Sequence, residues 1–274
     1  MIRCLLILIV IVSVPLAAAD EKGDVLDYLD RLGDENAVLA EKIWGYAELG
    51  YLETQSSALL QSRLAEAGFE VTAGVAGLPT AFVASFGEGE PVIGILAEFD
   101  ALPGISQSAS PIREILEGQP NGHACGHHLF GTGSMAAALA IKNWMEATKV
   151  KGTIRLYGTP AEEGGSGKVY MVRAGLFADV DTVLHWHPSN RNAANPATSL
   201  ANKSARFRFR GVSSHAAAAP DRGRSALDAV EAMNYMINMM REHVPQETRI
   251  HYVITKGGEA PNVVPDLAEV YYYV

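Results

Sequence analysis

"PVIGILAEF", residues 91–99, is the stretch of this sequence that decides the fold. It is almost continuously apolar, and such a run is typical of a central strand that is covered on both faces of its sheet. Shorter strand patterns precede it at residues 69–75 and 80–86, with glycine and proline between them. Before these, apolar residues recur at helical spacing over residues 24–49 and 54–67. The first hundred residues therefore combine two helices with a buried strand.

Downstream of this strand the two kinds of element alternate. Residues 129–144 and 169–174 predict helices, and residues 152–160 and 179–188 predict strands. The alternation indicates an α/β fold with a mostly parallel central sheet and helices on both faces. Functional groups in such sheets gather beyond the carboxyl ends of the strands. Residues 100–122 form a long loop, which in a compact domain is often functional.

A second unit follows a polar, asparagine-rich segment at residues 190–202. It is predicted to have β-α-β-β order, with elements at residues 205–211, 223–243, 249–255 and 267–274. One helical stripe is predicted to be core: Val230, Met233, Ile237 and Met240. We therefore expect a first domain over residues 20–195 and a second over residues 196–274. The last strand ends at Val274 with nothing to cover its sheet, so we expect a C-terminal part of the protein to be missing.

Residues 1–19 have a basic start, an apolar centre and a small-residue end, the pattern of a secretory signal peptide. We expect cleavage near Ala19, a periplasmic or secreted product, and no stable membrane span after cleavage. The alternative is an uncleaved membrane anchor, although the apolar run is shorter than the ~20 residues that a span needs.

The net charge limits the class of partner that the chain can bind, and the number of cysteines limits the roles that Cys125 can have. The chain has 274 residues and a formal net charge of −9, so it would repel nucleic acid, and a small molecule or another protein is the expected partner. Removal of the signal peptide leaves Cys125 as the single cysteine, so no intramolecular disulfide can form. Cys125 is then either a buried apolar residue or a metal ligand or nucleophile.

Metal-binding residue types occur at three places that follow predicted strands. They are Cys125 and His127 in "NGHACGHHLF" (121–130), Glu162 and Glu163 after residues 152–160, and His185 and His187 in residues 179–188. Gly126 lets Cys125 and His127 converge on one ion, while the second histidine pair is expected to share one strand face. One glutamate can bind metal while the other moves a proton. Sulfur, imidazole and carboxylate together suit two divalent ions, zinc or manganese. His123 and His128 are expected to be bystanders beside the turn.

Five motifs in this order resemble the metal-dependent amidohydrolases related to aminoacylase and the glutamate-releasing carboxypeptidases. They are "HACGHH", "TPAEEGGSGK", "HWHP", "GVSSHAAAAP" and "GGEAPNVVPD". The nearest branch holds hippurate hydrolase, the auxin-conjugate hydrolases and the B subunit of p-aminobenzoyl-glutamate hydrolase. The resemblance runs from about Asp20 to the last residue. It implies a di-metal catalytic domain with an inserted lid that dimerises, with a second kind of subunit as the alternative.

The resemblance also implies roles for single residues. Cys125 would bridge the two metals, His127 and Glu163 would be ligands, and Glu162 would be the general base. The hippurate-hydrolase pattern makes His185 the next ligand, whereas the aminobenzoyl-glutamate pattern makes it His187, which we prefer slightly.

Two lid residues inherit roles in the same way. His215 would stabilise the oxyanion in the neighbouring subunit's site, and Asn262 would help to hold the substrate near its carboxylate. From the residues alone, the alternatives are that His215 caps the helix that follows and that Asn262 is a turn residue beside two prolines.

The sequence departs from the family at two points. His128 stands where many relatives have Asp. Relatives also continue for well over a hundred residues and supply one more histidine ligand, so we expect this chain to be the front part of a longer protein.

We therefore predict a metal-dependent amidohydrolase that cleaves N-acyl or N-aroyl amino acids, plausibly of the p-aminobenzoyl-glutamate type, with metal-activated water. Two alternatives stay open. One is a non-catalytic fragment that binds metal or a partner, and the other is a cysteine hydrolase that uses Cys125 as its nucleophile.

Overall fold

The computed structural model describes residues 21–194 and 198–274, so the predicted signal peptide lies outside the described residues. The chain divides into two compact units, Met1–Asn192 and Ala193–Val274. Among the described residues, every helix is too short or too polar to cross a membrane.

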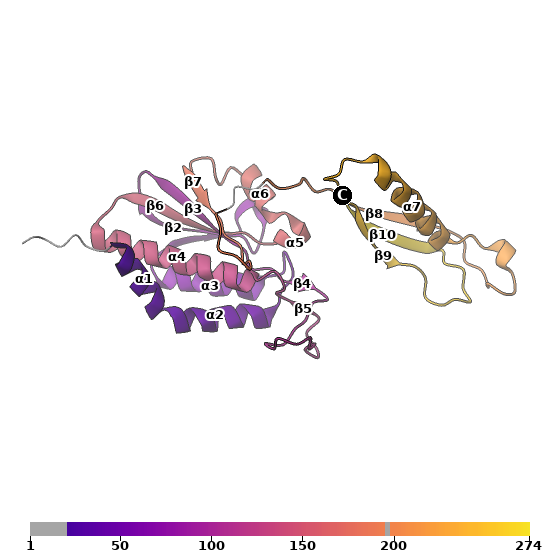
Figure 1. Ribbon diagram of the computed structural model, residues 1–274, viewed down its shortest axis with the longest axis horizontal. Helices are drawn as coiled ribbons and strands as arrows, with labels where there is room; N and C mark the ends of the chain where they lie inside the picture. Colours follow the sequence, from indigo (N-terminus) through magenta and orange to yellow (C-terminus); the bar gives the residue numbers. More distant parts are fainter. Residues whose placement is uncertain (1–20, 195–197) are drawn as a thin grey trace, which may run out of the picture. The chain divides into compact units, whose positions relative to one another are not determined.

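A five-stranded sheet forms the centre of the first unit, in the order β1-β2-β6-β3-β7 (Figure 1). Its strands are β1 (Glu70–Ala73), β2 (Phe82–Glu88), β3 (Val92–Ala97), β6 (Gly152–Gly158) and β7 (Thr182–Leu184). β3 is parallel to both β6 and β7, whereas β2 is antiparallel to both of its neighbours. Four of the five strands therefore run one way, which confirms the predicted mostly parallel sheet.

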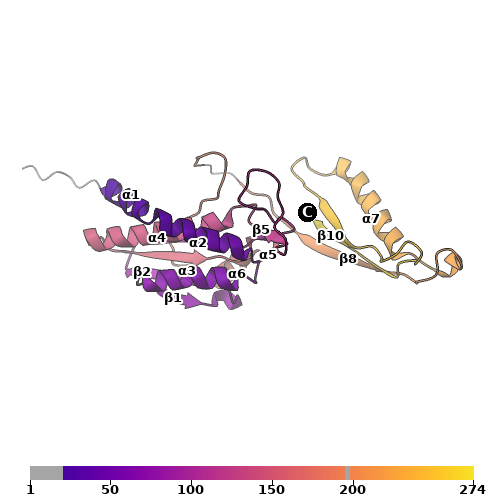
Figure 2. The ribbon, with the colours of Figure 1, turned by 90° about the horizontal axis from the view of Figure 1, so that it is seen from below.

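Helices cover both faces of this sheet (Figures 1 and 2). The helical elements are α1 (Glu21–Arg31), α2 (Gly33–Tyr46), α3 (Thr54–Glu66), η1 (Val75–Gly77), α4 (His127–Thr148), α5 (Glu162–Gly165) and α6 (Gly167–Arg173). On β3, Ile95 packs in a core with α2, α3 and α4, while its neighbour Leu96 packs in a second core with α6. Alternate side chains of this apolar strand thus bury both faces, as its sequence predicts.

The helix predicted over residues 24–49 is two helices that meet at Leu32. Gly33, a poor helix former, follows the break, and the acidic Asp34 and Glu35 then occupy the first turn of α2, where the helix dipole favours them.

The carboxyl ends of β3, β6 and β7 meet at one edge of the sheet because the three strands are parallel. The long loop after β3 is closed at its base by two short paired strands, β4 (Leu102–Pro103) and β5 (Asn121–Gly122). The turn after β5 leads directly into α4, which brings the cysteine and histidines of "HACGHH" to this edge.

The second unit is an antiparallel sheet in the order β8-β10-β9 with one long helix. Its elements are β8 (Ser204–Arg210), η2 (Pro220–Arg222), α7 (Ala226–Met240), η3 (Arg241–His243), β9 (His251–Lys256) and β10 (Leu267–Tyr273). The β-α-β-β order is as predicted. Val230, Met233 and Ile237 of the predicted stripe belong to its core. Met240 is 46% exposed, so its prediction as core is wrong, because it lies in the last turn of α7.

Candidate metal centre

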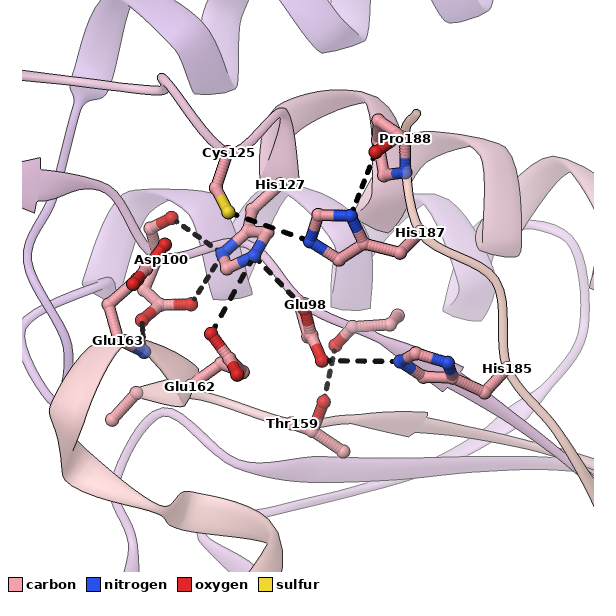
Figure 3. A network of polar contacts seen from close by, with 12 residues as sticks. Glu98, Asp100, Cys125, His127, Thr159, Glu162, Glu163, His185, His187 and Pro188 are labelled. Carbon is pink, nitrogen blue, oxygen red and sulfur yellow. Dashed lines mark hydrogen bonds and ion pairs between the residues drawn. The ribbon is translucent and has the colours of Figure 1, made fainter. Parts of the chain in front are cut away.

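Three parallel strands and one turn deliver polar side chains to the same place (Figure 3). Glu98 and Asp100 follow β3, Glu162 and Glu163 follow β6, His185 and His187 follow β7, and Cys125 and His127 come from the turn before α4. The predicted strand over residues 179–188 ends at Leu184, where its pairing with β3 stops. His185 and His187 therefore lie beyond the strand and do not share a strand face, which corrects the expectation.

Gly126 shapes the turn that holds Cys125 and His127. Its φ of 79° is left-handed, and a Cβ atom there would lie 3.0 Å from two side-chain carbons of Pro188. The turn places the Cys125 Sγ atom 3.6 Å from the His187 Nε2 atom. One ligand atom from each of Cys125, His127 and His187 lies within 4.8 Å of the other two.

His127 is fully buried between two carboxylates. Its Nδ1 atom donates to Asp100, 2.9 Å from Oδ1 and 3.0 Å from the backbone oxygen. Its Nε2 atom lies 3.0 Å from Glu98 Oε2, yet neither atom has a hydrogen bond of good geometry. Burial lowers the pKa of His127, but Asp100 and Glu98 outweigh it and raise the pKa to about 10. The site thus carries an excess of negative charge around this ring.

Glu98 joins several groups of the site, and it was missed from the sequence. Its carboxylate is 2% exposed, forms an ion pair with Lys168, and has Oε1 3.5 Å from His185 Nε2. Burial raises the pKa of Glu98, but His127 and Lys168 prevail and lower it to about 2. The available signal was an acidic residue placed directly after the apolar run of β3.

Glu162 and Glu163 point in different directions, as expected for neighbours at a strand end. Glu162 is at the open side, with its side chain 44% exposed and Oε2 4.0 Å from His127 Nε2. Glu163 donates its backbone N–H to Asp100 Oδ2 at 2.8 Å, and its Oε1 atom is buried without a partner among the described residues. Burial and then the charges of Glu98 and Glu163 raise the pKa of Glu162.

Cys125 experiences the same negative field. Burial raises the pKa of its thiol to about 12, and a hydrogen bond to Glu163 and the charges of Glu162 and Glu98 act in the same direction. Without a nearby cation this sulfur therefore stays a thiol at neutral pH, whereas metal coordination deprotonates a cysteine.

The residues fit a divalent metal. Three buried polar atoms of this region lack a hydrogen bond of good geometry among the described residues: Glu98 Oε2, His127 Nε2 and Glu163 Oε1. Two groups of possible metal ligands include His127. One group adds Cys125 and His187, and the other adds Glu98 and Glu162. A cation would satisfy these atoms and offset the charge, and the mixture of S, N and O ligands is the one expected for zinc or manganese.

Glu53, a second residue missed from the sequence, supports the wall of the site. Its fully buried carboxylate accepts hydrogen bonds from the Ala161 backbone N–H at 2.8 Å and from the Thr80 hydroxyl at 2.9 Å. Ala161 has a left-handed φ of 55° immediately before Glu162. Glu53 therefore fixes the strained backbone from which the two site glutamates start.

His215 and Asn262 lie together in the second unit, and both are exposed. The Ala216 N–H donates to the Asn262 backbone oxygen at 3.0 Å. The His215 Nδ1 atom accepts from the backbone N–H groups of Ala217 and Ala218, at 3.2 and 3.1 Å. His215 thus caps its own turn, and its Nε2 atom must carry the proton of the neutral ring.

Known proteins match both the sequence and the fold. The chain is 48% identical over 239 residues to the B subunit of p-aminobenzoyl-glutamate hydrolase from Escherichia coli, an alignment that covers 86% of this chain and 50% of that protein. The structure of an aminobenzoyl-glutamate utilization protein from Klebsiella pneumoniae matches with a TM-score of 0.59 and 19% identity, over 91% of this chain and 68% of that one. A dinuclear metal binding peptidase from Bacillus subtilis matches with a TM-score of 0.56 and 22% identity, over 90% and 64%. The two structures confirm the predicted fold.

The chain spans about half the length of the curated relatives it matches. The profile of "Peptidase family M20/M25/M40" matches residues 94–269, more than half of the chain, and these residues contain every motif on which the predicted resemblance rests. With this match and the 48% identical relative, the chain belongs to peptidase family M20/M25/M40.

Proposed function

We propose that this protein is a metal-dependent amidohydrolase that cleaves N-acyl or N-aroyl amino acids, with p-aminobenzoyl-glutamate as the leading substrate. The observation that carries the proposal is the proximity of a thiol, two imidazoles and two carboxylates at the carboxyl edge of the sheet, in two groups that share His127 and whose ligand atoms lie within 4.8 Å of one another. The 48% identity to one subunit of a p-aminobenzoyl-glutamate hydrolase supports the choice of substrate.

We assign Cys125, His127, Glu163 and His187 to two divalent cations, zinc or manganese. His187 is preferred over His185 because its Nε2 atom lies beside Cys125, whereas His185 lies beside Glu98. Bound cations of this kind polarise a carbonyl and lower the pKa of water. Asp100 holds the His127 ring through Nδ1, so that Nε2 is the atom available for a ligand bond.

Glu162 is the proposed general base. It is half-exposed beside the donor cluster, and its raised pKa brings the carboxylate closer to the range in which it can both accept and return a proton. It would take a proton from water and pass it to the leaving nitrogen. His215 would donate its Nε2 proton to the developing oxyanion, and Asn262 would hold the substrate near its carboxylate.

The assembly and the location of the protein complete the proposal. We assign residues 196–274 to a lid through which two copies pair, so that His215 serves the partner's site; a second kind of subunit is the alternative. The signal-like residues 1–19 direct the protein to the periplasm or outside the cell.

A pair of substitutions tests the function in the full chain. Cys125→Ser removes the sulfur ligand, so we expect bound metal to fall well below wild type and hydrolysis of p-aminobenzoyl-glutamate to drop by at least about a hundredfold. Glu162→Gln should leave the metal content unchanged and lower kcat by about a hundredfold or more, because only the proton acceptor is lost. Glu88→Gln, an exposed change on β2, is the control and should match wild type. Normal turnover in both site variants would overturn the proposal.

A cysteine hydrolase is the second candidate because Cys125 Sγ lies 3.6 Å from an imidazole nitrogen. In that case hydrolysis would survive a chelator and disappear on thiol alkylation. The opposite pattern supports the metal enzyme, and bound metal without any turnover supports the non-catalytic alternative.

A further inference from the structure

The segment that carries His185 and His187 has little support from the sheet. Strand β7 is three residues long, and its pairing with β3 stops at Leu184. The next three residues, His185, Trp186 and His187, are all exposed. Both imidazoles nevertheless point toward the polar cluster, His187 toward Cys125 and His185 toward Glu98 (Figure 3). Side-chain contacts therefore have to position these two rings.

Trp186 attaches this segment to helix α4. Its indole Nε1 atom donates to Ser134 Oγ at 3.1 Å, and Ser134 is 1% exposed. Gly133 leaves room for the ring, because a Cβ atom there would lie 2.9 Å from Trp186 Cζ2. The indole thus lies directly against α4 where the helix has two small residues in succession, although 42% of Trp186 remains exposed.

Phe130 lies at the centre of the site's aromatic rings. It is fully buried in the core that contains α6. Its ring centroid lies 5.1 Å from that of His185, 5.4 Å from Trp186, 6.1 Å from His187 and 6.4 Å from His127. All four ring planes are steeply inclined to that of Phe130, by 63° to 82°, which is the edge-to-face geometry that aromatic pairs prefer. One buried ring therefore contacts three imidazoles of the site and the indole between two of them.

We propose that Phe130 and Trp186 are positioning residues that together form an aromatic clamp, and that this clamp sets how strongly the site binds a divalent cation. The core fixes Phe130 and Ser134 fixes Trp186, so the exposed segment reaches the cluster from two anchored side chains. Without the clamp, binding of a cation would have to order this segment, and the lost entropy would reduce the affinity. The inference rests on the metal centre of the proposed function, but it does not depend on hydrolysis.

Zinc affinity of the full chain, stripped with a chelator and titrated in competition with a zinc-binding dye, tests the clamp. Ser134→Ala removes the acceptor of the indole N–H, and Trp186→Phe removes the donor. Each should weaken zinc binding about fivefold, the effect of one hydrogen bond. Trp144→Phe is the matched control, because Trp144 Nε1 also donates at 3.1 Å, to Glu21 Oε2, and Trp144 lies near the other end of α4. It should bind zinc as wild type does.

Gly133→Ala separates positioning from stability. Alanine favours a helix more than glycine does, which offsets part of the packing lost at the indole, so thermal unfolding should stay close to that of wild type. The new Cβ would displace Trp186, so zinc affinity should still fall about fivefold or more. Gly45→Ala in α2 is its control, because a Cβ there has nothing within 4 Å, and zinc affinity should be unchanged.

The outcomes separate the clamp from the proposed function. Wild-type zinc affinity in Ser134→Ala, Trp186→Phe and Gly133→Ala would overturn the clamp and leave the metal centre in place. An equal loss in Trp144→Phe would also overturn it, because the effect would then be general. Wild-type protein that binds no zinc would reject the metal centre and the clamp together. The expected zinc affinities without hydrolysis of p-aminobenzoyl-glutamate would retain the clamp and reject the enzyme.

Discussion

Single buried side chains set the geometry of this site as much as the proposed ligands do. Glu53 shows this most clearly, because its carboxylate is fully buried and holds the Ala161 N–H and the Thr80 hydroxyl. Burial raises its pKa. A raised pKa in the folded state means that this group favours folding when it is protonated, below its ordinary value of 4.5. That contribution is lost as the pH rises through the folded-state pKa.

Glu53→Gln is therefore expected to be as stable as wild type at pH 7, or more stable by about 1 kcal/mol, because it keeps both hydrogen-bonding positions without a buried charge. Glu53→Ala leaves the Ala161 N–H unsatisfied and should lose about 2–3 kcal/mol. Urea unfolding at pH 5 and pH 8 measures both, and the difference between the Glu53→Gln variant and wild type should grow with pH. An alanine variant as stable as wild type would refute the role.

Short turns decide where the ligands of the site lie, and Gly126 is the clearest case among these elements. Its left-handed backbone disfavours any side chain, and Pro188 from the segment after β7 occupies the space where a Cβ would stand. The turn before α4 and the segment that carries His187 are thus in direct contact, which is how Cys125 and His187, 62 positions apart, come within 3.6 Å of each other.

Backbone strain alone is expected to cost about 1–2 kcal/mol of stability in the Gly126→Ala variant. The contact with Pro188 should make the loss larger and should also weaken metal binding. Gly175→Ala is the matched control, because Gly175 has a φ of 78° but nothing within 4 Å of its missing Cβ. Thermal unfolding and metal titration compare the two. Equal losses in both variants would show that contact with Pro188 has no effect.

At the scale of the whole molecule, the proposal of a lid that pairs two copies makes a prediction about assembly. Residues 20–274 are expected to sediment as a dimer at micromolar concentration. Strand β9 is an edge of its sheet and exposes Val253 at 58% and Ile254 at 44%, so it offers a surface for strand pairing. Val253→Lys should then shift the protein toward monomer, and a wild-type monomer at every concentration would contradict the lid assignment.

Much of this architecture was predictable from the sequence because it follows from patterns that are local. The apolar run of β3 predicted a central strand. The motifs contain Cys125, His127, Glu162 and His187, which the structure brings together in two groups that share His127. Glu98 and Glu53 were not predictable, because their burial depends on partners 70 and 108 positions away. The end of β7 at Leu184 was missed for the same reason: an apolar pattern does not reveal where a neighbouring strand stops.

The reversed direction of β2 has a consequence for how this molecule tolerates change. Because β2 is antiparallel to β6, the first residue of β2, Phe82, pairs with the last residue of β6, Gly158. Thr80 therefore stands at the rim where the two site glutamates emerge, and it braces them through Glu53 although it contributes no chemistry. The hairpin β1–β2 lies at one edge of the sheet and contributes no ligand or proton donor to the site. Deleting it would nevertheless remove Thr80, and with it one of the hydrogen bonds that hold Glu53 beneath the two site glutamates.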